Sequence, residues 1–309
     1  MNPGFSKLVE CVPNISEGRD RVAISRIVES VAMVPGVRIL HVDSGVTTNR
    51  TVITFVGEPT VCLRAGVALF DAAVEHIDMR KHTGAHPRLG AVDVFPFVPL
   101  ERTSMAECIA LAHELGELVW ERVFFYEHAA KQRQRQNLAT VRRGEYEGLP
   151  EKLKDPNWLP DCGAPQRNER SGATIIGART FLVAYNISLG AADVKVARTI
   201  AAKLRESGST QKQEDGTTTQ TPGRFTHCRA IGCQGPELGG AQVSVNFTDF
   251  SITGLYPVFE ACVQEARAQG TSVKGSELIG LVPKQALLDV TSSLTSGLGD
   301  DSLTEQARL

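Results

Sequence analysis

The densest polar stretch of the chain spans positions 77–88 and contains two histidines four residues apart. His82 and His86 could share a zinc ion if the stretch were helical, because positions four apart lie on one helix face. Gly84 and Pro87 oppose a helix here, since both residue types destabilise helix interiors. Imidazole has an ordinary pKa suited to proton transfer near neutrality. The stretch therefore indicates a loop-borne acid/base histidine or a histidine tied into its loop by backbone hydrogen bonds, with zinc as a third alternative.

A second candidate is Asp43, which follows the apolar run 37–42 and precedes a loop that contains Gly45. A carboxylate at the end of a strand, beside a loop, is a common arrangement in active sites. The same position also suits an Asx-turn, in which the carboxylate accepts hydrogen bonds from its own loop. The sequence leaves both interpretations open.

Two short segments place the same polar residues where a strand leads into a helix. Asn14 and Ser16 precede the first expected helix, and Asn186 and Ser188 precede its counterpart later in the chain. Such residues commonly cap helix N-termini, and free N–H groups at a helix N-terminus also bind carboxylates. Basic side chains that could bind a carboxylate, or be solvated surface charges, are Arg50, Arg80, Lys81, Arg88 and Arg224.

The apolar patterns predict two copies of a β-α-β-β-α-β order, which is typical of ferredoxin-like units. The first copy is expected at 8–12, 19–34, 37–42, 51–56, 59–77 and 91–98, and the second at 181–187, 191–206, 228–233, 242–247, 256–269 and 272–281. Between them we expect a helix at 104–121, a strand at 123–126, partly helical chain at 136–153 and an ordered loop at 155–170. The polar stretch 207–222 predicts a flexible surface loop, and 283–293 a last helix.

Composition narrows the class of protein. The chain has 309 residues, with 33 Lys and Arg against 35 Asp and Glu, so its net charge is close to zero. Such a charge gives no reason to expect nucleic acid or an anionic membrane as a partner. Seven cysteines at irregular spacing argue against a disulfide framework. No secretory signal or membrane-length apolar run is visible, so a cytoplasmic location is expected.

Longer motifs resemble the formiminotransferase domain of the formimidoyltransferase-cyclodeaminase family. The matching segments cover nearly the whole chain and lie at 8–18 (LVECVPNISEG), 48–51 (TNRT), 77–88 (IDMRKHTGAHPR), 144–153 (GEYEGLPEKL), 172–174, 184–188 and 280–283. The resemblance implies an α+β fold of two related ferredoxin-like subdomains, residues 1–179 and 180–309, with a ligand cleft between them.

The resemblance also implies an activity: transfer of the formimidoyl group of N-formimidoyl-L-glutamate to tetrahydrofolate, a co-substrate, with no metal. It implies His86 as the catalytic histidine. For this reaction we expect Asp43 as a second catalytic residue, because a carboxylate would stabilise the amidinium and orient it. Expected ligand-binding residues outside the folate loop are Asn14, Asn49, Arg50, Arg88, Asn186, Gly223 and Arg224. The expected folate loop comprises Gly163, Ala164, Pro165, Gln166, Arg167, Asn168, Glu169, Arg170, Ser171 and Gly172, where the charged sequence departs from the family and Arg167 and Arg170 could serve a polyglutamate tail.

Expected partners are small molecules, a second copy of the chain in a homodimer and a separate cyclodeaminase, because that second activity is expected to be missing here. Three other functions are compatible with these residues: an enzyme of the same fold that acts on 5-formyltetrahydrofolate, a non-catalytic folate-binding protein, and a metal hydrolase. His86, Asp43 and the Asn49–Thr51 loop together argue against a protein that only binds folate.

We predict different outcomes for the two histidines. His86→Ala should lower kcat strongly and change folate affinity little, because an acid/base residue acts mainly in the transition state. His82→Ala should lower activity less, and through the structure of the loop. Steady-state kinetics of both folded variants check this, and a larger loss of kcat in His82→Ala would mean that the wrong histidine is named.

Overall fold

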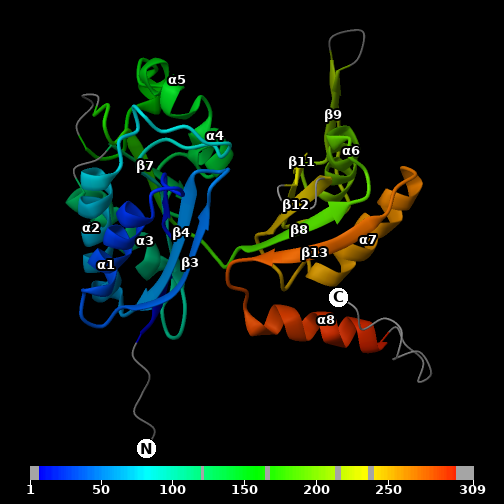
Figure 1. Cartoon of the computed structure of the whole chain (residues 1–309), viewed down its shortest axis with the longest axis horizontal. Coiled ribbons are helices and arrows are strands. Elements are labelled where there is room, and N and C mark those ends of the chain that lie inside the picture. Colours follow the sequence, from blue (N-terminus) through cyan, green and yellow to red (C-terminus); the bar gives the residue numbers. More distant parts are fainter. Residues whose placement is uncertain (1–6, 120–121, 164–167, 213–216, 236–239, 297–309) are drawn as a thin grey trace, which may run out of the picture. The chain divides into compact units, whose positions relative to one another are not determined.

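The computed structural model describes residues 7–119, 122–163, 168–212, 217–235 and 240–296. The chain divides into two compact units, Met1–Thr180 and Phe181–Leu309, and each unit has a main sheet of its own (Figure 1). No helix within these described residues is long and apolar enough to cross a membrane. The seven cysteines are free thiols, and all but Cys233 are buried.

The first unit begins with the predicted β-α-β-β-α-β order. Its elements are β1 (Val9–Cys11) with β2 (Asn14–Ile15), α1 (Arg21–Ala32), β3 (Arg38–Gly45), β4 (Arg50–Gly57), α2 (Pro59–His76) and β5 (Val92–Pro99). The β1–β2 segment and β4 are central, flanked by β5 and β3, and these strands pair antiparallel. The helix α1 forms because Ala23, Ile24, Ile27 and Val31 make one apolar face, which is buried.

Pro13 separates β1 from β2, although both lie between β4 and β5. Proline has no N–H and cannot donate to the ladder, so pairing is interrupted at this residue. Its carbonyl oxygen still accepts a 2.9 Å hydrogen bond from the N–H of Ile53 on β4. Cys11 pairs with Phe55 and Asn14 with Val52, so β1 and β2 keep one register on β4 across the proline.

The rest of the first unit extends this sheet. Its elements are α3 (Met105–Leu118), β6 (Arg122–Glu127), α4 (Leu138–Arg142), α5 (Glu145–Lys152) and β7 (Ala173–Ala178), and β7 pairs parallel with both β5 and β6. The sequence interpretation missed β7, a short apolar run buried along its length. Burial on both faces removes the alternation that identifies a strand.

Helices cover the two faces of this sheet unequally. One core packs apolar residues of α1, α2 and α3 against one face. A second, smaller core packs Val141 of α4 and Leu149 of α5 against the other face, on residues of β5, β6 and β7. The part of that second face formed by β3, β4 and β2 carries polar side chains, and we refer to it below as the polar face.

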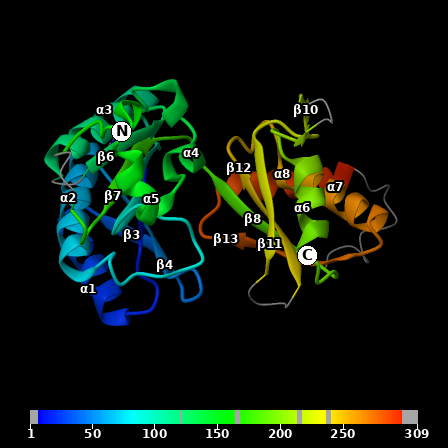
Figure 2. The same ribbon diagram turned by 90° about the horizontal axis from the view of Figure 1, so that it is seen from above.

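The second unit repeats the same topology. Its elements are β8 (Val183–Leu189), α6 (Val194–Leu204), β11 (Cys228–Gln234), β12 (Ala241–Phe247), α7 (Leu255–Ala268), β13 (Val273–Ile279) and α8 (Lys284–Ser296). The sheet order is β11–β12–β8–β13, so the first and third strands are again central. Figure 2 shows α6 and α7 on the same side of this sheet. The prediction of two ferredoxin-like units is confirmed.

Two expectations about local structure were wrong. The stretch 207–222 contains an antiparallel hairpin, β9 (Ser209–Lys212) with β10 (Thr218–Thr221), instead of an irregular loop. Asn14 and Asn186 lie inside strands and do not cap the helices that follow, because the helices begin later. The caps are Asp20 for α1 and Asp193 for α6, whose carboxylates accept hydrogen bonds from backbone N–H groups of the first turn.

A buried ion pair fixes the chain that follows β6. The guanidinium of Arg135 donates to Asp161 at 2.7 Å, and only 1% and 5% of the two side chains are exposed. Asp161 also accepts a 2.9 Å bond from the N–H of Phe125 on β6. The same guanidinium donates to the carbonyl oxygens of Asn157 and Leu159, at 2.8 and 2.7 Å. The pair therefore holds the segment that leads into the 163–172 loop against the sheet.

We expect Asp161→Ala to destabilise the first unit by about 3–5 kcal/mol, because it leaves the charge of Arg135 buried without its carboxylate. The matched control is Glu151→Ala, which removes an ion pair to Lys154 whose side chains are 70% and 76% exposed and should cost less than about 1 kcal/mol. Urea unfolding followed by tryptophan fluorescence measures both. Equal losses in the two variants would contradict the role assigned to the buried pair.

Candidate functional site

One row of residues crosses the polar face of the first sheet. Asp43 on β3 pairs with Val52 on β4, and Val52 pairs in turn with Asn14 on β2. Directly paired residues project from the same face of a sheet, and successive residues alternate between faces. Asp43 and Asn14 therefore lie on the face opposite to Ile15, which is in the helix-covered core. Arg50, two residues before Val52 on β4, projects from the same polar face. Because Asp43 is a paired residue within β3, the Asx-turn interpretation is wrong.

His86 contacts this row from the loop that joins α2 to β5. Its Nδ1 donates a 2.7 Å hydrogen bond to the carbonyl oxygen of Pro87, and its Nε2 accepts one from Nη1 of Arg50. A carbonyl oxygen can only accept, so the proton is on Nδ1 and the lone pair is on Nε2. His86 is therefore a neutral imidazole whose basic nitrogen faces an arginine.

Close backbone contacts hold this loop against the turn between β3 and β4. The N–H of Ala85 donates to the carbonyl oxygen of Thr47 at 3.2 Å. A Cβ on Gly84 would lie 2.3 Å from the carbonyl oxygen of Thr48, so only glycine permits this approach. The glycine that opposed a helix in the sequence is thus the residue that brings His86 to the sheet.

His82, in contrast, uses both ring nitrogens inside the protein and is 8% exposed. Its Nε2 donates to the carbonyl oxygen of Asn49 at 2.8 Å, and its Nδ1 accepts from Nε of Arg88 at 3.2 Å. The amide of Asn49 accepts from the N–H of Gly18 and donates to the carbonyl oxygen of Thr83, both at 2.9 Å. These bonds indicate a structural role for His82, and they occupy both ends of the Asn49 amide.

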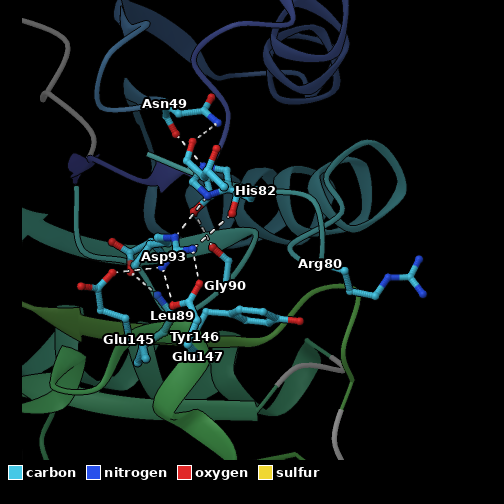
Figure 3. Close-up of polar contacts among 12 residues, drawn as sticks. Asn49, Arg80, His82, Leu89, Gly90, Asp93, Glu145, Tyr146 and Glu147 are labelled. Atoms are coloured by element: carbon cyan, nitrogen blue, oxygen red, sulfur yellow. Dashed lines mark hydrogen bonds and ion pairs between the residues drawn. The ribbon is translucent and has the colours of Figure 1, made fainter. Parts of the chain in front are cut away.

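Arg88 joins this network to α5. Its guanidinium donates to Glu147 at 2.6 and 2.7 Å and to Glu145 at 3.0 Å, and the whole residue is 7% exposed. Figure 3 shows Asn49 and His82 at one end of this network and Glu145 and Glu147 at the other. The proposed contact of Arg88 or Asn49 with a ligand stays a prediction, and it would require these bonds to be exchanged.

Arg80 lies outside the network, and Figure 3 shows its side chain pointing away. It makes a two-pronged bond to Asp78 at 2.8 and 2.7 Å while 52% of its side chain is exposed. This geometry favours the interpretation of Arg80 as a solvated surface charge.

The sequence interpretation missed two charged residues near His86. Asp93 on β5 is 1% exposed, accepts a 3.0 Å bond from the N–H of Leu89, and forms an ion pair with Arg142 at the end of α4. Asp93 could have been found, because a carboxylate between Val92 and Val94 in an apolar strand needs a partner. Nothing in the local pattern distinguishes Arg142 from its neighbour Arg143.

Burial and positive charge shift the pKa values of this site. The pKa of His86 is lowered to about 3 by burial first, then by the charges of Arg50 and Arg142, and Asp93 opposes the shift. The pKa of Arg50 is lowered to about 10 by burial and then by Arg142, against the opposing charges of Asp93 and Asp43. The site thus contains a neutral base between two guanidinium groups.

Three buried polar atoms of the polar face have no hydrogen-bond partner among the described residues: Oδ1 of Asn14, Nδ1 of His41 and Nε of Arg50. Buried polar groups are rarely left unpaired, because each costs roughly 1–3 kcal/mol. The amide oxygen of Asn14 is an acceptor and Nε of Arg50 is a donor, and Nη1 of the same arginine contacts the basic nitrogen of His86. This arrangement suits a polar ligand that carries both N–H groups and oxygen atoms.

No group of three or more His, Cys, Asp or Glu side chains among the described residues could hold a metal ion. His82 and His86 do not share a ligand position here, since Nε2 of His82 is bonded to Asn49 and Nε2 of His86 to Arg50.

The expected folate loop is described only in part, since Ala164, Pro165, Gln166 and Arg167 lie outside the described residues. Its second half is fixed: Oδ1 of Asn168 accepts from the N–H groups of Arg170 and Ser171 at 3.1 and 3.4 Å. The guanidinium of Arg170 donates to the carbonyl oxygens of Val74 and Glu75 at the end of α2, at 3.1 and 2.6 Å. Those bonds commit Arg170 to a helix end.

The candidates in the second unit lie in separate places. Asn186 on β8 donates to Glu277 on β13 at 3.1 Å. Gly223 follows β10, where a Cβ would lie 1.9 Å from the carbonyl oxygen of Arg205. Arg224 donates to Gln264 at 3.3 Å. Their proposed contacts with folate stay predictions.

Comparison with known proteins assigns both units. Residues 8–179 match the family model "Formiminotransferase domain, N-terminal subdomain", and residues 184–300 match "Formiminotransferase domain". A formimidoyltransferase-cyclodeaminase from Gallus gallus is 44% identical over 92% of the chain. The chain spans 52% of the length of that relative.

Two relatives are of similar length to the chain. A glutamate formimidoyltransferase from Streptococcus pyogenes is 40% identical, with 93% of the chain and 92% of the relative covered. A protein of the same name from Thermoplasma acidophilum is 40% identical, with 92% and 90% covered. From these matches, which extend over both units and include the loop that carries His86, the chain belongs to the formiminotransferase family.

Proposed function

We propose that the chain transfers the formimidoyl group of N-formimidoyl-L-glutamate to N5 of tetrahydrofolate, which gives 5-formimidoyltetrahydrofolate and L-glutamate. The name shared by the two full-length relatives supports this reaction. The observation that carries it in the structure is the neutral His86, whose proton is held on Nδ1 and whose Nε2 lone pair faces the polar face that contains Asp43.

The reaction needs a group that accepts a proton and then returns it. N5 of tetrahydrofolate attacks the amidinium carbon, an N5–C bond forms, and the C=N electron pair moves to nitrogen. Nε2 of His86 removes the proton from N5 and delivers it to the glutamate nitrogen, and the C–N bond to glutamate breaks as the adduct collapses. Proton transfer of this kind typically contributes roughly 10²- to 10⁴-fold in rate.

Asp43 has a separate role in this proposal. Its carboxylate stabilises the positive amidinium and orients it for attack, as the opposite charge and the exposed position on β3 allow. Holding both substrates in the right geometry supplies much of the remaining acceleration.

Several finer expectations stay predictions. They are a folate site between the subdomains that uses the 163–172 loop, a polyglutamylated folate, a homodimer, a cytoplasmic location and a separate cyclodeaminase partner.

The direct test is to mix the protein with tetrahydrofolate and N-formimidoyl-L-glutamate and to detect 5-formimidoyltetrahydrofolate. In the same assay Asp43→Asn should lower kcat/KM for the donor roughly ten- to a hundredfold, because one charge-assisted bond is lost. The control is Asp71→Asn on the exposed side of α2, which should leave the rate unchanged. Absence of product, or full activity of Asp43→Asn, would contradict the respective assignments.

A second prediction concerns pH. The pKa of His86 is about 3 in the folded protein against an ordinary value of 6.5, so between these values the unfolded chain binds a proton that the folded chain does not. The free energy of unfolding should therefore fall as the pH is lowered from 6.5 toward 3. His86→Gln cannot take up this proton and should lose less stability over the same range. Urea midpoints of both proteins at several pH values check this, and parallel pH profiles would refute it.

A further inference from the structure

One guanidinium group contacts the imidazole of His86, and the positive charge of a second acts on it from another element. Arg50 comes from β4 and Arg142 from the end of α4, and the charges of both act on His86. The charge of Arg142 also acts on Arg50 and lowers its pKa. Like charges that converge in a partly buried site need an anion to offset their repulsion.

The protein supplies that anion to only one of them. Asp93 on β5 bonds Nε and Nη2 of Arg142 and is held in place by the N–H of Leu89. Among the described residues no carboxylate lies within ion-pair distance of Arg50. Its Nε has no partner, and its Nη1 donates to the neutral ring of His86. Arg50 is thus a half-buried cation without a carboxylate partner among the described residues.

A carboxylate would bind Arg50 better than the imidazole does. Hydrogen bonds between ionised partners are roughly twice as strong as those between neutral ones, and guanidinium binds carboxylate with two parallel bonds. The two Nη nitrogens at the end of Arg50 can form such a fork, and Nη1 is the one that now donates to His86. A carboxylate that takes Nη1 and Nη2 of Arg50 would compete directly with Nε2 of His86 for Nη1.

We propose that Arg50 and Arg142 together bind one carboxylate of the formimidoyl donor, and that this binding frees Nε2 of His86 to accept the proton. The inference rests on the proposed function for the identity of the donor, and it adds Arg142 as a specificity residue and Asp93 as its positioning residue. The site selects an amidine that carries a carboxylate, and a bare amidine such as formamidine leaves the imidazole blocked.

The groups that face His86 define what should change on binding. They are Arg50 on β4, Arg142 on α4 and Asp93 on β5. A bound carboxylate adds negative charge next to the two cations, so it should raise the pKa of His86 toward its ordinary range. N-formyl-L-glutamate is a suitable probe, because it keeps both carboxylates of the donor and carries no transferable amidine.

The experiment combines binding and kinetics in matched variants. In histidine-labelled protein, the resonance that His86→Gln removes identifies His86, and its titration is followed with and without N-formyl-L-glutamate. Arg142→Lys retains the positive charge but loses the planar guanidinium, which can form two parallel hydrogen bonds to a carboxylate. The double variant with Asp93→Asn and Arg142→Gln removes both charges, so no buried carboxylate is left without its partner. Arg143→Met, the exposed neighbouring arginine, is the control.

We expect N-formyl-L-glutamate to raise the pKa of His86 by at least one unit in the wild type and in Arg143→Met, but not in the double variant. The KM for the donor should rise roughly tenfold or more in the double variant and less in Arg142→Lys, while the KM for tetrahydrofolate changes less than about twofold. Formamidine should be a poor donor through a lower kcat as well as a higher KM.

Three results would overturn the proposal: a His86 titration that the probe does not change, an unaltered donor KM in the double variant, or formamidine as an efficient donor. Failure of the proposed function has a different signature. If the protein forms no 5-formimidoyltetrahydrofolate but N-formyl-L-glutamate still shifts His86 in the wild type and not in the double variant, the carboxylate site stands and the assigned reaction does not.

Discussion

The buried guanidinium of Arg88 is the interaction on which the geometry of the site depends. It bonds Glu147 and Glu145 of α5, the ring of His82 and the carbonyl oxygen of the same histidine. His82 in turn bonds the backbone of Asn49, at the turn between β3 and β4. One side chain thus connects the helix, the histidine loop and the hairpin that carries Asp43 and Arg50. The side chains of Glu145 and Glu147 are 42% and 64% exposed, so solvent weakens each ion pair with Arg88. Arg88 therefore stabilises the site mainly because it joins several segments of the chain.

Most of the fold could be predicted from the sequence, because the residue patterns that identify helices and strands are local. Pro59 at the start of α2, the alternating strands and the capped helices all follow from the chain itself. The strand β7 escaped detection because it is buried on both sides, and the hairpin β9–β10 because its described side chains are polar and exposed and leave no apolar face to recognise.

The site was predicted less completely because its decisive contacts join residues far apart in the chain. The sequence identified His86 and Asp43 as candidate catalytic residues, but it did not identify the residues that contact them. The pairing of Asp93 with Arg142 and the contact of Arg50 with His86 depend on how β5, α4 and β4 pack together. Asn14 was named for the wrong reason, since it belongs to a strand and not to a helix cap. The corresponding strand of the second unit places Asn186 next to Glu277, where the first unit has Val94 next to Asn14.

The break at Pro13 has a consequence for how this family of sequences can change. The polar face and the apolar core are separated by a single residue in β2, where Asn14 points one way and Ile15 the other. Inserting or deleting one residue here would exchange the two side chains, turning the amide into the core and the isoleucine toward the substrates. Pro13 keeps the register here, because its carbonyl oxygen accepts a hydrogen bond from the N–H of Ile53 and the strand pairs with β4 in the same register on both sides of it. Length variation should therefore be tolerated in the loops beyond the sheet long before it is tolerated between Cys11 and Ser16.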